Sequence, residues 1–113
     1  MQETANEWLI YKSKVHNLSY INYKLYKHII NPNNYPSGAA GTEGAYQLDH
    51  IIPKRYCFDN NIPFELCAHP TNLQMIPWLD NVKKRTNIDF ENIPYVLVEY
   101  FQNQKLNNED TNG

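Results

Sequence analysis

The first half of the chain combines apolar stripes of helical spacing with one long polar segment. Apolar residues recur three or four positions apart in residues 4–16, which predicts a helix with Thr4 as its N-cap. Ser19 can cap a second helix, whose apolar stripe consists of Ile21, Leu25, His28 and Ile29. Prolines and glycines in residues 31–44 then predict a loop.

Two short strands are expected in the middle of the chain. Residues 45–52 (AYQLDHII) favour a strand that ends before Pro53, and residues 72–76 (NLQMI) favour a second one. The connection between them is long, and residues 61–70 within it predict a short helical turn. Strands that are mixed with helices in this way indicate an α+β fold.

Two further helices are predicted after the second strand. Residues 80–86 favour a short helix, and residues 93–106 favour a closing helix with Pro94 near its first turn. The side chains of the closing helix that are expected to cover the core are Val96, Leu97, Tyr100 and Phe101.

Composition bounds the class of protein. A chain of 113 residues with 42% hydrophobic residues has the length and content of one globular domain, residues 1–113. Residues 106–113 (LNNEDTNG) are too polar to pack and are expected to be a frayed, disordered tail. No apolar run approaches the ~20 residues that span a bilayer, and the start lacks the features of a signal peptide. We therefore expect a cytoplasmic protein with no membrane partner.

The cysteines and the distribution of charge further limit the class of protein to which the chain can belong. Cys57 and Cys67 make neither a disulfide framework nor a zinc-binding Cys-x-x-Cys pair, so both are expected to be reduced and partly buried. The net charge of -2 arises in residues 87–113, which hold one lysine against five acidic residues. The remainder is slightly basic, so a local basic face for nucleic acid stays open.

Asp49 and His50 are adjacent at the end of the first predicted strand. Alone, such a pair is a weak indication of catalysis, because it is common in polar loops. The second strand and the short helix add Asn72 and Asn81, and this order of elements would bring Asp49, His50 and Asn81 together. Adjacent residues of a regular strand face opposite ways, so the strand must end or twist at the pair.

Three sequence blocks resemble the HNH, or ββα-metal, endonuclease motif. They are LDHIIP at 48–53, TNLQMIPW at 71–78 and DNVKKR at 80–85. The likeness extends over roughly residues 11–86 to small stand-alone HNH nucleases carried by bacteriophages. It implies a site made of a β-hairpin and a short helix, with N-terminal and C-terminal helices flanking this core.

The resemblance also implies a role for each residue. His50 would be the general base that activates water, because an imidazole with an ordinary pKa near 6.5 accepts protons at neutral pH. Asp49 and Asn81 would be oxygen ligands of a divalent cation, and asparagine in place of the last histidine favours Mg²⁺ or Mn²⁺. Asn72 is grouped with the catalytic residues, because in the family its side chain bonds backbone near the catalytic histidine and orients the ring.

Basic residues on both sides of the motif are the expected DNA contacts. Lys84 and Arg85 follow Asn81 by three and four positions, so on a helix they share its face and would reach neighbouring phosphates. In many proteins such a run is only a solvated helix face, so this assignment depends on Asn81 being a ligand. The full set of expected DNA contacts is Lys54, Arg55, Lys83, Lys84 and Arg85.

These patterns favour a metal-dependent endonuclease that hydrolyses the phosphodiester bonds of double-stranded DNA, with Mg²⁺ or Mn²⁺ as cofactor. The alternative is a non-catalytic DNA-binding or docking module with the same fold in a larger phage or restriction assembly. A purely structural protein would require all three blocks to match by chance. Because a chain of 113 residues offers little surface for a long target, weak specificity or a homodimer is expected. Homing, restriction, junction processing and packaging all remain open, because such domains serve in each of them.

Overall fold

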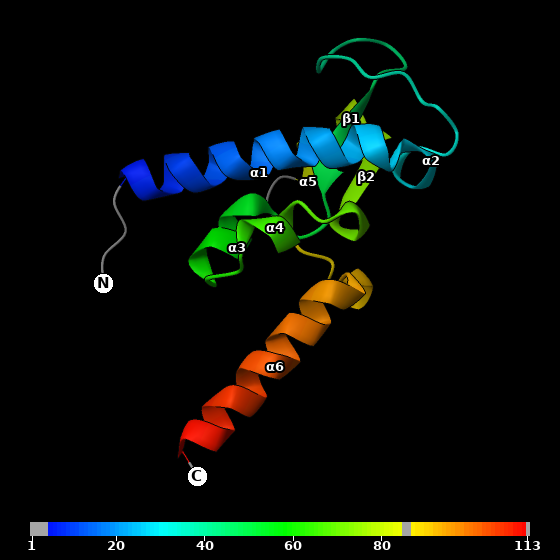
Figure 1. Cartoon of the computed structure of the whole chain (residues 1–113). Coiled ribbons are helices and arrows are strands. Elements are labelled where there is room, and N and C mark those ends of the chain that lie inside the picture. The colour runs from blue at the N-terminus through cyan, green and yellow to red at the C-terminus, as the bar shows by residue number, and fades with distance from the viewer. Residues whose placement is uncertain (1–4, 85–86, 113) are drawn as a thin grey trace.

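The protein has a mixed α+β fold, in which several helices surround a two-stranded antiparallel sheet (Figure 1). The computed structural model describes residues 5–84 and 87–112. In chain order, the elements are α1 (Ala5–Leu25), α2 (Lys27–Ile30), β1 (Tyr46–His50), α3 (Lys54–Asp59), α4 (Phe64–Cys67), η1 (Pro70–Asn72), β2 (Leu73–Pro77), α5 (Trp78–Lys84), η2 (Phe90–Asn92) and α6 (Tyr95–Asn112).

The N-terminal region is one long helix followed by one short helix. The predicted boundary at Ser19 is wrong, because α1 runs without a break to Leu25 and Ser19 is a buried residue within it. No proline or glycine interrupts α1, so nothing stops the helix at that serine. The expected cap at Thr4 lies outside the described residues.

The apolar stripe predicted after Ser19 does not face the core. Its three aliphatic members, Ile21, Leu25 and Ile29, are each more than half exposed. The core lies against another face of α1, where Val15 is fully buried. The predicted stripe is also divided between two helices, because Ile21 and Leu25 belong to α1 and Ile29 belongs to α2. Helical spacing alone could not say which side of a helix the rest of the chain covers.

The two strands form a hairpin that leads directly into a helix. β1 pairs with β2 in antiparallel register from Tyr46↔Pro77 to His50↔Leu73. β1 ends two residues earlier than predicted, at a bend over residues 51–52. α5 begins immediately after β2, and the Trp78 amide donates to the Ala45 carbonyl at 3.0 Å. The hairpin and α5 therefore form one continuous unit.

The connection between the strands is more ordered than the sequence suggested. The predicted helical turn is confirmed as α4, but α3 was not predicted. Pro53 stands at the N-cap of α3, so the proline that limits the strand also starts a helix. The hydrophobic core gathers where this connection, α1 and α6 meet; its buried residues are Val15, Ile52, Cys57, Ile62, Cys67, Ala68 and Leu97.

The closing helix agrees with the prediction at its start and differs at its end. α6 begins directly after Pro94, and Leu97 is fully buried, with Val96, Tyr100 and Phe101 packed against the core. The tail expected to fray from residue 106 is helical as far as Asn112, because neither proline nor glycine interrupts the segment. None of the described helices combines the length and the apolar character needed to cross a membrane.

Candidate functional site

One cavity of about 370 Å³ brings together the three residues expected to carry chemistry. Asp49 and His50 reach it from the last two positions of β1, and Asn81 reaches it from α5. An adjoining cavity of about 500 Å³ shares His50 and Asn81 and extends towards Tyr46. The hairpin and the helix thus place residues more than thirty positions apart around a common hollow.

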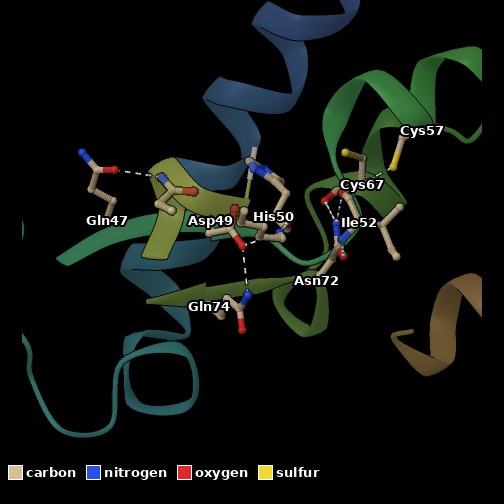
Figure 2. Close-up of polar contacts among 10 residues, drawn as sticks. Gln47, Asp49, His50, Ile52, Cys57, Cys67, Asn72 and Gln74 are labelled. Atoms are coloured by element: carbon tan, nitrogen blue, oxygen red, sulfur yellow. Dashed lines mark hydrogen bonds and ion pairs between the residues drawn. The ribbon is translucent and has the colours of Figure 1, made fainter. Parts of the chain in front are cut away.

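The Asp49 carboxylate is buried and held from two directions. Its Oδ2 accepts a hydrogen bond from Gln74 Nε2 at 2.9 Å, across the hairpin (Figure 2). The same oxygen accepts from Lys84 Nζ at 2.6 Å, and this ammonium also donates to the His50 carbonyl at 2.6 Å. Side-chain exposure is only 18% for Lys84 and 10% for Asp49, so the ion pair is largely shielded from water.

The amide orientation of Asn81 follows from its neighbours. Gln47 Nε2 contacts the Gly38 carbonyl at 3.5 Å, which leaves Gln47 Oε1 to accept from Asn81 Nδ2 at 2.8 Å. With its nitrogen bonded in this way, Asn81 presents its carbonyl oxygen elsewhere. Within the described part of the chain, Oδ1 of Asn81 and Oδ1 of Asp49 accept no hydrogen bond. Two residues that line the cavity therefore each keep one oxygen without a hydrogen bond, and both oxygens are of the kind that bind hard cations.

His50 points away from α5 and towards α1. Its Nε2 lies 2.8 Å from the Ser19 hydroxyl, while Asp49 is bonded to Lys84 of α5. The two neighbours thus face opposite ways, as strand geometry requires, and still line one cavity because β1 ends at His50.

The environment keeps the His50 imidazole neutral. Its pKa is lowered from 6.5 to about 3, mainly by burial and to a smaller extent by the nearby charges of Lys54, Lys84 and His16. When the proton of the neutral ring is on Nε2, that nitrogen donates to Ser19 and leaves the Nδ1 lone pair available. Sequence reasoning missed Ser19 because it read the residue as a helix cap. Its signal was a small polar residue four positions after the core residue Val15.

Asn72 is fully buried and ties the hairpin to the connection. Its Oδ1 accepts from the Ile52 amide at 2.8 Å, and its Nδ2 donates to the carbonyls of Ile52 at 3.2 Å and Cys67 at 2.8 Å (Figure 2). Its own carbonyl accepts from the Ile51 amide at 2.8 Å. These bonds fix the backbone immediately after His50. None of them reaches the imidazole, so Asn72 acts on the ring only through this backbone.

Of the basic residues expected to contact DNA, two stand beside the cavity. Lys54 and Arg55 line it from the start of α3, together with Lys12 of α1, which sequence reasoning missed. Burial, and to a smaller extent the charge of Lys12, lowers the pKa of Lys54. The Arg55 guanidinium lies over the Trp8 ring at 4.9 Å, which orients it at the rim.

The two lysines of α5 that were expected to contact DNA, Lys83 and Lys84, have different surroundings. Lys83 is exposed, whereas the ammonium of Lys84 is bonded to Asp49. Arg85 falls outside the described residues. The sequence did not reveal that the nearest partner of Lys84 is an acid of the same site.

Among the described residues, no group of three or more histidine, cysteine, aspartate or glutamate side chains is arranged to hold a metal ion. The ligands expected here, the carboxylate of Asp49 and the amide oxygen of Asn81, do not make up such a group. No protein-family model, curated protein or solved structure matches the chain.

Proposed function

We propose that the protein is a metal-dependent DNA endonuclease of the HNH type. The observation that carries the proposal is the shared cavity in which Asp49 and His50 from a hairpin meet Asn81 from the helix that follows it. This is the order and placement that the ββα-metal motif implies. The three basic side chains Lys12, Lys54 and Arg55 at the same cavity suit a polyanionic substrate.

His50 would serve as the general base. Its imidazole is uncharged across the neutral pH range because its pKa is lowered to about 3, so Nδ1 can accept a proton from water. Ser19 holds Nε2 and thereby limits rotation of the ring. Asn72 anchors the backbone after His50 and keeps the end of β1 in place.

The open oxygens of Asp49 and Asn81 would hold the divalent cation. One carboxylate oxygen and one amide oxygen form a hard donor pair that fits Mg²⁺ or Mn²⁺ and leaves coordination positions for water and phosphate. A cation bound there would neutralise charge on the phosphate and stabilise the leaving alkoxide. Products with a 5′-phosphate and a 3′-hydroxyl are expected from the family resemblance.

A second candidate is a DNA-binding or docking module without catalysis. Two observations favour it: the Lys84 ammonium already holds the Asp49 carboxylate, and a pKa near 3 makes His50 a weak base. Both activities would use the same basic rim, so DNA binding alone cannot separate them. Cleavage that requires a divalent cation does.

The test is incubation of the pure protein with supercoiled plasmid in Mg²⁺, Mn²⁺ or chelator. The parent should convert plasmid to nicked or linear forms only with a divalent cation, and His50→Ala should be slower by about 10²- to 10⁴-fold. His28→Ala is the matched control, because His28 is exposed on α2 and outside both cavities. Cleavage by His50→Ala at the parent rate would remove the proposed base. Absence of cleavage under every condition, with duplex binding retained, would favour the docking module.

A further inference from the structure

The amino group of Lys84 lies between two oxygens at the edge of the candidate metal site. Its Nζ is 2.6 Å from Asp49 Oδ2 and 2.6 Å from the carbonyl oxygen of His50. The helix that carries Asn81 thus also delivers a positive charge to the carboxylate that a metal would need. Sequence reasoning assigned Lys84 to DNA phosphates, and the observed contact suggests a different task.

Asp49 requires a positive partner whether or not a metal is present. Its carboxylate is 90% buried, and a buried charge without compensation is strongly unfavourable. Lys12, Lys54 and Arg55 line the same cavity, yet Lys84 is the cation that bonds Asp49 in the described part of the chain. When no metal is bound, Lys84 therefore neutralises the site.

We propose that Lys84 is an internal counter-cation that competes with the divalent cation for Asp49. The inference rests on the proposed function, because it assumes that Asp49 and Asn81 hold the metal. A divalent ion on Asp49 Oδ1 and an ammonium on Oδ2 of the same carboxylate repel each other at short range. Cation binding therefore displaces the ammonium of Lys84, and the affinity for the metal is lower than the two oxygen ligands alone would give.

Displacement also gives Lys84 a second position. Once released from Asp49, its ammonium is an unpaired cation at the end of α5, the helix that also carries Asn81, and a phosphate group near the site would attract it. Because coupling between two bound partners is reciprocal, whatever draws Lys84 away from Asp49 also raises the affinity for the cation. The lysine would thus favour metal binding when a polyanion is present and oppose it when none is.

The experiment is calorimetric titration of Mn²⁺ into the intact chain without DNA. Lys84→Gln removes the charge and keeps a hydrogen-bond donor, and it should bind Mn²⁺ about tenfold more tightly than the parent. Lys84→Arg retains the charge and should bind with the parent affinity. Lys83→Gln is the control for loss of one positive charge on the exposed side of α5 and should also match the parent. Equal or weaker Mn²⁺ affinity in Lys84→Gln would overturn the competition.

A thermal melt in chelator gives an independent readout. Lys84→Gln should melt at a lower temperature than the parent, because Asp49 loses its partner, and added Mn²⁺ should raise its melting temperature more than that of the parent. If Lys84→Gln does not fold, Lys84→Arg decides about the inference. A Mn²⁺ affinity of Lys84→Arg far from the parent value would show that the charge at position 84 does not set the affinity for the metal.

Failure of the metal site itself has a different signature. If neither the parent nor any Lys84 variant binds Mn²⁺, the proposed function and the inference fall together. If the parent binds Mn²⁺ and Asp49→Ala does not, the proposed metal site at Asp49 is supported. The comparison of Lys84→Gln with the parent then decides whether Lys84 competes with the metal.

Discussion

Asn72 offers the sharpest test of how the site is held, and the change to make is Asn72→Ala. The side chain is fully buried and makes three hydrogen bonds, one from the Ile52 amide and two to the carbonyls of Ile52 and Cys67. Alanine removes every one of them. The Ile52 amide and the Cys67 carbonyl then lose the partner that Asn72 provides, and the Ile52 carbonyl keeps only the weak contact from the Cys57 thiol at 3.8 Å. Water cannot easily replace the lost amide, because the site is closed.

The magnitude follows from these three bonds. A buried group that loses its partner costs about 1–3 kcal/mol, so we expect a loss of roughly 3–5 kcal/mol in the free energy of unfolding. That is a large share of the ~5–15 kcal/mol that stabilises a typical domain. With a urea dependence of about 2 kcal/mol per M, the unfolding midpoint should fall by roughly 2 M.

Urea denaturation followed by circular dichroism measures this effect directly. Asn17→Ala is the matched control, because Asn17 is exposed on α1 and its change to alanine favours the helix slightly. Asn72→Asp adds a second comparison, since it keeps the shape but cannot donate to Cys67. A midpoint within about 0.3 M of the parent for Asn72→Ala would refute the view that these bonds hold the connection to the hairpin.

Three further outcomes are expected. Ser19→Ala should slow cleavage by about tenfold without changing Mn²⁺ affinity, and Ser19→Thr should restore the rate, since the hydroxyl orients His50. The pKa of His50 is about 3 in the folded chain and 6.5 ordinarily, so unfolding takes up a proton between these two pH values. The free energy of unfolding should therefore fall as the pH drops from 6.5 towards 3. Urea midpoints measured at several pH values should fall less steeply for His50→Gln than for the parent. In chelator, Lys54→Ala and Lys12→Ala should each lower the salt slope of duplex binding by about one unit, whereas Lys105→Ala, which lies far along α6, should leave the slope unchanged.

Local patterns predicted the parts of the fold whose signals are short-range. Alternation and flanking prolines located both strands to within a few residues, and helical spacing with Pro94 located the start of α6. The break in the N-terminal helices was misplaced because Ser19 is equally suitable as a cap and as a small buried residue. Only the packing of His50 against α1 decides between these uses.

The candidate site was predictable as a set of residues but not as a network. The three sequence blocks named Asp49, His50 and Asn81, and all three line one cavity. The partners that set their chemistry come from distant segments, and neither spacing nor propensity encodes such contacts. Lys84 shows this best, because its ion pair with Asp49 depends on how α5 lies against β1.

The polar contacts of the site also determine when it can form. Asp49 bonds a residue 25 positions later and another 35 positions later, and Gln47 bonds one 34 positions later. A chain emerging from the ribosome therefore contains none of these three contacts until β2 and α5 have been synthesised. Each contact must close a long loop of chain, which slows folding relative to local helix formation. We expect α1 to form early in synthesis and the cavity lined by Asp49, His50 and Asn81 to be among the last features to appear.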